Sequence, residues 1–425
     1  MKGWKITNSL RQQIYKYAQL PQTGVSLRQM VQFGPRPSQG SLFHASYFAV
    51  HELPIRLSHR VRELEGLPLG LADEESIKLV RDWYAMSFEE LLAIPEPDVG
   101  NLQELVLGEK SKEENWTFED DGVIVSRKRR VVGERSQYFK ACPKDLLYPN
   151  QVVEYNKTVT EVLKKIKKRH DATVTTLAKG VQNWKMKNNR GYLDSSVNQF
   201  LDRFYMSRIG IRMLIGQTIA LNLQSMKNMQ DDDYVGIISL KCNVKEIAQD
   251  AIDAARFACE EHYNIMEIPK VLLYAADDLN FRYVPAHLVH MLYETLKNSL
   301  RATIEHHSKL NPSVPLEDIE YPPIKIIVAK GDEDITIKIS DEGGGIPRSA
   351  VPLVWTYFYT SAEKSDFLNE SGLKAPFMGL GVGLPHSRLY ARYFHGDLKL
   401  ISMEGYGTDV YLHLNRLGNS SEPLY

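Results

Sequence analysis

The chain has 425 residues, with 52 Lys and Arg against 53 Asp and Glu, so its formal net charge is −1. This balance argues against binding nucleic acid through the overall field of the protein, and no apolar run reaches the roughly 18 residues that span a bilayer. The three cysteines form no CxxC pair, which excludes the usual zinc and disulfide frameworks and favours a reducing compartment. We therefore expect two domains with no nucleic-acid and no membrane partner.

The N-terminal stretch is basic, because Lys and Arg occur there and no acidic residue precedes Glu52. Trp4, Leu10 and Ile14 are interspersed, so this stretch can form a basic amphipathic helix. Such a composition is typical of a mitochondrial transit peptide, and residues 1–25 are a candidate targeting segment. An ordinary basic first helix is an equally good interpretation of the composition alone.

Most of the first half is expected to be helical, since apolar residues recur at helical spacing in four segments. These segments are 51–68, 74–94, 152–184 and 195–221. Ser195 is a candidate N-cap of the last segment. Four long antiparallel helices predict a four-helix bundle, which we assign to residues 26–233.

A charged stretch separates the second and third of these helices, at about residues 99–149. Its composition predicts a long loop or insertion that is partly disordered. Its basic run at 127–130 is more typical of a solvated surface than of a docking site.

After Asp233 the pattern changes to strands that alternate with helices. Strands are predicted at 233–244 and 270–275, hairpins at 324–340 and 397–414, and helices at 244–263 and 285–307. This mixture predicts an α/β sandwich over residues 234–425, with the domain boundary near Asp233. The whole chain is therefore expected to be α+β, with a helical bundle followed by a mixed sandwich.

The helix expected at 285–307 carries His290, Glu294 and Asn298 four residues apart, so their side chains share one helical face. A carboxylate and an amide on one face can orient water around Mg²⁺, which prefers oxygen ligands and keeps several waters. Taken alone, the motif leaves open a solvated polar stripe on an amphipathic helix.

The next candidate segment is ISDEGGGI, where a strand is expected to end. Asp341 can accept a hydrogen bond from an exocyclic amine such as that of adenine. Gly343, Gly344 and Gly345 allow the backbone to turn tightly and to approach a flat ring. A plain glycine-rich turn is the alternative for this segment alone.

Two further glycine segments follow. Gly379, Gly381 and Gly383 in GLGVGLP precede a helix, whose N-terminal N–H groups favour phosphate. The βαβ context of a dinucleotide-binding fold is missing, and no GxxxxGK[ST] phosphate loop occurs. In GYGT, Thr408 offers a hydroxyl near the start of a strand.

In order and spacing, these four segments resemble the N, G1, G2 and G3 boxes of the GHKL superfamily of gyrases, chaperones, histidine kinases and MutL. They lie within about 120 residues. The resemblance implies a GHKL (Bergerat) α/β sandwich that binds ATP. Residues 357–378 would then form the ATP lid, a mobile cover. The lid residues that suit a polar cover are Thr360, Ser361, Lys364, Gly372 and Lys374.

Within that superfamily the chain most closely resembles the mitochondrial pyruvate dehydrogenase kinases, with the branched-chain 2-oxoacid dehydrogenase kinases next. The resemblance is carried by HELPIRLSHR and FLDRFYMSRIGIRML in the first half, and by HMLYETLKNSLRAT, IKISDEGGGIP and GLGVGLPHSRLYARYFHGDLKLISMEGYGTDVYL in the second. It covers most of the chain from about Ser26 to Leu414. It implies a protein-serine kinase that uses Mg-ATP to phosphorylate and inactivate the decarboxylase (E1 alpha) component of the complex.

The resemblance also assigns roles to single residues. Glu294 would be the general base, with His290 tuning its basicity, and Lys297 would hold the nucleotide or the catalytic face. Asn298 would bind Mg²⁺, whereas Asp341 and Thr408 would recognise adenine. The other nucleotide-binding residues expected are Arg301, Gly343, Gly345, Thr360, Ser361, Gly379, Leu380, Gly381, Val382, Gly383 and Leu384.

The helical domain would be regulatory, with a pocket for pyruvate-like acids, although its arginines could equally make interhelical salt bridges. The expected pocket residues are Tyr84, Ser87, His170, Ser207, Arg208, Ile211 and Arg212. The resemblance further implies that this domain binds the lipoyl domain of the acyltransferase core. It also implies a homodimer formed through the sheet of the second domain, in the mitochondrial matrix.

Three alternatives remain beside this interpretation. The branched-chain enzyme is the nearest, since GTDVYL resembles that family as well. A histidine kinase is a more distant alternative, because His51 in HELP resembles a phospho-acceptor box, although we expect this residue to begin a buried helix. A GHKL ATPase without kinase activity is the third.

Overall fold

The computed structural model describes residues 4–97, 148–188, 193–226, 232–359 and 381–424. Two compact units divide the chain, the first made of residues 1–188, 207–238 and 424–425 and the second of 189–206 and 239–423. Nearly all of the predicted charged insertion, including the run at 127–130, lies outside the described residues. Within these residues, no helix is long and apolar enough to cross a membrane.

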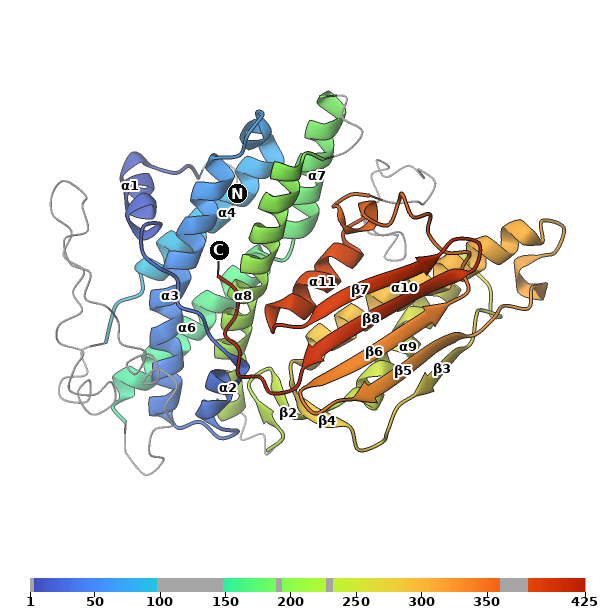
Figure 1. The fold of residues 1–425 in the computed structure, drawn as a ribbon. Coiled ribbons are helices and arrows are strands. Elements are labelled where there is room, and N and C mark those ends of the chain that lie inside the picture. Colours follow the sequence, from blue (N-terminus) through green and yellow to red (C-terminus); the bar gives the residue numbers. More distant parts are fainter. Residues whose placement is uncertain (1–3, 98–147, 189–192, 227–231, 360–380, 425) are drawn as a thin grey trace. The chain divides into compact units, whose positions relative to one another are not determined.

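The first unit is built from helices (Figure 1). They are α1 (Asn8–Tyr17), α2 (Leu27–Met30), α3 (Gln39–Glu65), α4 (Glu75–Leu92), α6 (Asn150–Arg169) and α7 (Thr173–Lys187), with 3₁₀ turns η1 (Val31–Phe33) and η2 (Leu71–Asp73). α3 packs against α4 and α6, and α4 packs against α7. Helix α8 (Ser195–Met226) contributes residues to both units, and the short strand β1 (Tyr234–Val235) follows it.

Helix α1 is part of the packed first unit. Leu10 and Ile14 are buried, and the Tyr15 hydroxyl donates a 2.7 Å hydrogen bond to Glu65 of α3. Arg11 pairs with the same carboxylate at 3.2 Å. This packing favours an ordinary first helix for these residues, and the targeting role of 1–25 stays a prediction.

The helix predicted at 51–68 begins much earlier, at Gln39, where the Ser38 hydroxyl accepts a hydrogen bond from the Ser41 N–H. Its first turns are buried on nearly all sides, from Gly40 to Ala45 and beyond. A helix that is buried on all sides has no polar face, so its apolar residues do not form a stripe on one side. The sequence pattern therefore did not predict this first part of the helix.

The single helix predicted at 152–184 was wrong, since the chain forms α6 and α7 with a turn over 170–172. His170 caps α6 and is itself buried, and the turn lets α6 pack on α3 while α7 packs on α4. The turn is so short that apolar residues keep helical spacing on both sides of it.

The predicted cap Ser195 was also displaced by one residue, because α8 begins there and the Asp194 carbonyl accepts from the Asn198 N–H.

The second unit places three helices on one face of a five-stranded sheet (Figure 1). The strand order is β3 (Val271–Tyr274), β5 (Ile324–Lys330), β6 (Asp334–Asp341), β8 (Gly407–Asn415) and β7 (Asp397–Met403). β3 is parallel to β5 and the remaining neighbours are antiparallel. The covering helices are α9 (Val244–Tyr263), α10 (Pro285–Leu310) and α11 (Gly383–Tyr393).

The core of this unit follows from period-2 alternation in the strands. Ile335, Ile337 and Ile339 of β6 are buried towards the helices, as are Val410 and Leu412 of β8. The predicted hairpins and helices are thus confirmed. The strand β4 (Asn280–Tyr283), which pairs antiparallel with β2 (Ile238–Asn243), was missed because four residues give too short a pattern. Short 3₁₀ turns complete the unit, η5 (Leu316–Asp318) and η6 (Leu353–Trp355).

Candidate nucleotide and phosphotransfer site

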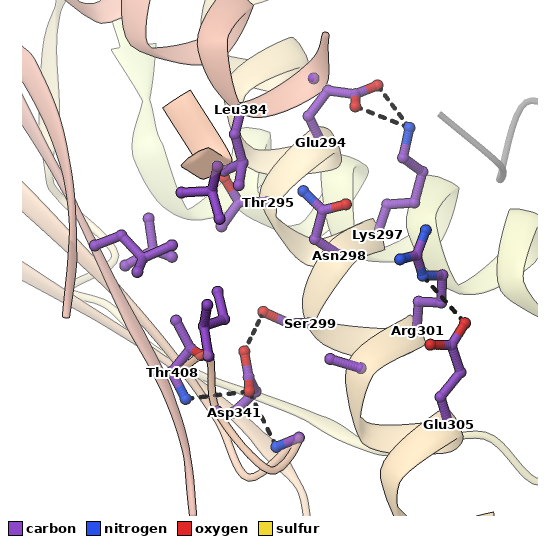
Figure 2. A pocket seen from close by; sticks show the side chains of 18 of the residues that line it. Glu294, Thr295, Lys297, Asn298, Ser299, Arg301, Glu305, Asp341, Leu384 and Thr408 are labelled. Carbon is purple, nitrogen blue, oxygen red and sulfur yellow. Dashed lines mark hydrogen bonds and ion pairs between the residues drawn. The ribbon is translucent and has the colours of Figure 1, made fainter. Parts of the chain in front are cut away.

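A cavity of about 380 Å³ opens between α10, the end of β6, the start of β8 and the start of α11. Its size suits a small-molecule ligand. Glu294, Lys297 and Asn298 line it together with Asp341 and Thr408 (Figure 2). The structure therefore brings together residues that lie more than a hundred positions apart in the sequence.

The carboxylate of Glu294 faces an ammonium group from the same helix. Lys297 Nζ lies 2.8 Å from Glu294 Oε2 and 2.9 Å from Oε1 (Figure 2). Lys297 is 4% exposed, and its ammonium also lies 5.5 Å from the centre of the Tyr293 ring. A buried cation is thus held beside a partly buried carboxylate at one part of the cavity.

Two other residues of this helical face differ in what they contact. Asn298 lines the cavity, and its amide makes no hydrogen bond with any residue in the described part of the chain. His290 lies one turn before Glu294 and packs against the ring of Tyr390 on α11, with 4.9 Å between ring centres. Of the residues on the predicted common face, Asn298 thus lines the cavity, whereas His290 packs against α11 and does not line it.

Asp341 ends strand β6 and is hydrogen-bonded through both carboxylate oxygens. Oδ1 accepts from the N–H groups of Gly343 at 3.0 Å and Thr408 at 3.3 Å, and Oδ2 accepts from the Ser299 hydroxyl at 2.8 Å. Burial raises the pKa of Asp341 above its ordinary value, although these three bonds partly oppose the shift. The antiparallel register places Thr408 directly opposite Asp341, so the two predicted adenine-reading residues meet.

Glycines are required where the backbone of the site is tightly packed. Gly345 has φ +69°, and a Cβ there would overlap the carbonyl oxygen of Met403. A Cβ on Gly383 would overlap Oε2 of Glu294. The first residue of α11 therefore touches the carboxylate of the catalytic candidate.

The N-terminus of α11 lies at the cavity, which Gly381, Gly383 and Leu384 line. Val382 is the N-cap residue of this helix. Free N–H groups at a helix start favour phosphate. Arg301 lines the cavity too and pairs with Glu305 at 3.2 Å. Thr360, Ser361, Gly379 and Leu380, like Lys364, Gly372 and Lys374 of the predicted lid, lie outside the described residues.

Near the start of the predicted lid, the Phe358 N–H donates to the Gly381 carbonyl at 2.9 Å, so these two residues, which flank the range outside the described residues, are neighbours. The preceding Tyr357 is buried, and its hydroxyl donates a 2.7 Å hydrogen bond to Asp202 of α8. Tyr359 itself lines the cavity.

Sequence reasoning missed Ser299, Tyr359, Glu305, His306 and Lys309, which line the cavity as well. Ser299, Glu305 and His306 lie on the same helix as Asn298, but their spacing in the sequence does not indicate that the cavity extends along this side of the helix. Ser299 immediately follows Asn298 and is 3% exposed, a burial that only the tertiary structure reveals.

Three of the predicted effector residues, Tyr84, Ser87 and His170, form a buried cluster. Tyr84 stacks on His170 with ring centres 4.4 Å apart, and the Ser87 hydroxyl lies 3.0 Å from His170 Nε2. Burial lowers the pKa of His170 to about 3. Arg169, which the sequence interpretation had not included, donates to the Ser87 hydroxyl at 2.7 Å and pairs with Glu90.

The remaining predicted effector residues lie on α8. Arg208 donates to the His170 carbonyl at 3.4 Å, and Arg212 pairs with Asp171 at 2.9 Å. Both contacts join α8 to the turn between α6 and α7, and the ion pair of Arg212 is of the kind that the salt-bridge alternative describes. Ile211 is buried, and Ser207 is half-buried with a hydroxyl that reaches no partner in the described residues.

His51, the candidate phospho-acceptor, lies within α3 and does not begin it. The expectation that it begins the helix was therefore wrong, whereas α3 is buried over much of its length, as expected. The His51 side chain itself is 44% exposed. Its Nδ1 lies 2.8 Å from the Tyr47 carbonyl and its Nε2 3.1 Å from Glu96 Oε1.

Comparison with known proteins adds two family matches. Residues 24–239 match a family described as "Mitochondrial branched-chain alpha-ketoacid dehydrogenase kinase". Residues 283–417 match one described as "Histidine kinase-, DNA gyrase B-, and HSP90-like ATPase". The second range contains every residue of the cavity.

Similar curated proteins extend over nearly the whole chain. Mitochondrial pyruvate dehydrogenase (acetyl-transferring) kinases of Schizosaccharomyces pombe and Arabidopsis thaliana are each 40% identical, covering 99% and 98% of this chain and 99% and 96% of their own. Isozyme 3 of the Homo sapiens kinase is 34% identical over 98% of this chain and 89% of its own.

Proposed function

The chain belongs to the mitochondrial pyruvate dehydrogenase kinase family, and we infer from this premise that it phosphorylates and inactivates the E1 alpha decarboxylase component of the pyruvate dehydrogenase complex. The reaction is the ATP-dependent phosphorylation of a protein serine. The observation that carries this inference beyond the family is that Glu294, Lys297 and Asp341 line one cavity together with the start of α11.

We propose that the cavity binds ATP with its adenine at Asp341 and Thr408. Both are nine-tenths or more buried, so hydrogen bonds to the base form away from water. Gly381 and Gly383 at the start of α11 would hold phosphate oxygens through backbone N–H groups. Lys297 supplies positive charge that can stabilise the phosphates during transfer.

Asn298 is the residue that would hold Mg²⁺. No group of three or more His, Cys, Asp or Glu in the described ranges forms a metal cluster. That fits magnesium, which is commonly held by one or two protein oxygens, several waters and the phosphates themselves. Once bound, the ion would neutralise phosphate charge.

Glu294 would accept the proton of the substrate serine hydroxyl. The serine oxygen then forms a bond to the γ-phosphorus as the bond from that phosphorus to the β–γ bridging oxygen breaks, and ADP leaves. His290 lies one turn away on the same helix and would position the carboxylate. Phosphoryl transfer needs mainly positioning and charge stabilisation, which these groups can supply.

We propose further that Tyr84, Ser87 and His170, with Ser207, Arg208, Ile211 and Arg212 of α8, form the pocket for pyruvate-like acids. The support is that Arg208 and Arg212 reach the turn at His170 and Asp171. Arginine can bind a carboxylate through two parallel hydrogen bonds. A binding titration with pyruvate, repeated on Arg208→Gln, tests this site.

The wider assembly is also a proposal. The exposed sheet face carries Tyr274, Ile327, Ile401 and Met403, each at least 44% exposed, which suits a homodimer formed through the sheet. The helical unit would bind the lipoyl domain of the acyltransferase core, and the protein would act in the mitochondrial matrix. A light-scattering mass near the monomer value of 48.6 kDa would count against the dimer.

The function is tested with radiolabelled ATP and Mg²⁺, offering the decarboxylase components of the pyruvate and branched-chain complexes separately. Acid-stable label on a serine of the pyruvate component is expected. Label only on the branched-chain component would favour the kinase that the first family description names. ATP binding without label on either would leave an ATPase or scaffold, and acid-labile label on His51 would revive the histidine kinase.

A further inference from the structure

Helix α10 carries three buried hydroxyl groups one turn apart, on Thr295, Ser299 and Thr303. The Thr295 hydroxyl donates to the Met291 carbonyl at 2.8 Å, and the Thr303 hydroxyl donates to the Ser299 carbonyl at 2.9 Å. These are the local bonds that hydroxyls in helices ordinarily make. The Ser299 hydroxyl instead donates across the cavity wall to Asp341 Oδ2 at 2.8 Å (Figure 2).

The hydrogen bonds of Asp341 leave one acceptor position on Oδ2 available. A carboxylate has about four acceptor positions, two on each oxygen. Oδ1 already accepts from two backbone N–H groups, those of Gly343 and Thr408. Oδ2 accepts only from Ser299 among the described residues, so its second position can accept a donor from a ligand in the cavity.

Burial makes this bond matter. Ser299 is 3% exposed and Asp341 is 5% exposed, so water is poorly placed to replace the hydroxyl. A hydrogen bond to a charged group is stronger than one between neutral groups. The Ser299 bond is also the largest single influence that lowers the pKa of Asp341 against the effect of burial, so it helps to keep the carboxylate an acceptor.

We propose that Ser299 is a positioning residue for purine recognition, which fixes the Asp341 carboxylate so that Oδ2 accepts an N–H of the 6-amino group. This inference rests on the proposed function, in which Asp341 recognises adenine. Ser299 then contributes to the preference for ATP over a purine triphosphate that lacks the amine. The ligand class is therefore a 6-aminopurine nucleotide, and the selectivity depends on a residue of the helix that also carries Glu294.

Calorimetric titration with ATP and with purine riboside triphosphate, which lacks the 6-amino group, tests the proposal on the full chain. The variants are Ser299→Ala and, as a matched control, Thr303→Val, which removes a buried hydroxyl from the same helix. Among the described residues, that hydroxyl makes only a local bond to the Ser299 carbonyl and no hydrogen bond to Asp341. Ser299→Ala should weaken ATP binding about tenfold and leave the analogue almost unaffected, as loss of a hydrogen bond to a charged group implies. The control should bind both ligands as the wild type does.

The ratio of the two affinities within one variant cancels any loss of folded protein. An unchanged ratio in Ser299→Ala would overturn the proposal, because a merely structural role weakens both ligands equally. A wild-type chain that binds ATP no better than the analogue would overturn it too, even with ATP binding intact. If the wild type bound neither nucleotide, the proposed function itself would fail, and the positioning role with it.

Discussion

Lys297 Nζ lies within 2.9 Å of both carboxylate oxygens of Glu294, so one ammonium group spans the carboxylate that is the candidate base (Figure 2). The pair is three residues apart on α10 and is largely withdrawn from solvent, with side chains 5% and 15% exposed. A base must present a free lone pair to the serine hydroxyl. We therefore expect the pair to restrain Glu294 before the nucleotide and the substrate arrive.

Glu294→Gln tests the base directly. The amide keeps the size of the side chain but accepts no proton, so phosphotransfer should fall by a factor of roughly 10²–10⁴. ATP affinity, which depends on Asp341 at another part of the cavity, should stay within about twofold. Both are measured by serine labelling and by nucleotide titration. Glu260→Gln, an exposed carboxylate of α9, is the control, and full transfer in Glu294→Gln would refute the base assignment.

Lys297→Met tests whether the ammonium acts through Glu294. The change keeps an unbranched side chain of similar length and leaves a partly buried carboxylate without its cation, so we expect kcat/KM to drop by about 10–100-fold. Combining it with Glu294→Gln separates two roles. If the lysine acts only by orienting Glu294, the double variant should be no worse than Glu294→Gln alone. Additive losses would instead assign Lys297 to the phosphates.

Gly383→Ala tests the contact between α11 and the base. The added Cβ would overlap Glu294 Oε2, the far end of a flexible side chain, so the protein should fold while the carboxylate moves. A displacement of about 1 Å can cost roughly 10²-fold in rate, so transfer should fall much more than ATP affinity. Gly216→Ala is the matched control, because its Cβ would meet Ile237 at an ordinary 3.6 Å. Equal activity in the two variants would contradict the contact.

The parts of this site that depend on local chemistry could be predicted from the sequence. Glu294 and Asn298 follow helical spacing, and Asp341 stands where an alternating strand ends before three glycines. The strands themselves were predicted because Ile335, Ile337 and Ile339 alternate with polar residues. Each of these signals lies within about ten residues of chain.

Relationships between distant segments could not be predicted in this way. No spacing rule places Gly383 against Glu294, or the hydroxyl of Ser299 on Asp341, because both depend on how α10 packs against α11 and the sheet. The turn at His170 was hidden for a related reason. At this turn a buried imidazole stacks on Tyr84, a contact between residues 86 positions apart that no local pattern indicates.

That buried imidazole predicts how stability depends on pH. Burial lowers the pKa of His170 to about 3, whereas an unfolded histidine titrates near 6.5. Between these values the unfolded chain binds a proton that the folded chain does not, so stability is complete above about pH 6.5 and falls as the pH drops. The slope approaches about 1.4 kcal/mol per pH unit from this residue. His287, whose pKa burial also lowers to about 3, should contribute a similar slope.

His170→Phe should therefore reduce the dependence of stability on pH without removing it. The phenyl ring can still stack on Tyr84 but cannot take a proton. The slope of unfolding free energy against pH should therefore be smaller in the variant than in the wild type, by the contribution of about one proton. Urea unfolding at pH 6.5, 6.0 and 5.5 measures both slopes, and comparing slopes removes the fixed cost of losing the bond to Ser87. His170→Phe combined with His287→Phe should flatten the curve further. Identical slopes for wild type and His170→Phe would mean that His170 is protonated as easily in the folded chain as in the unfolded one, and that its burial against Tyr84 does not persist in solution.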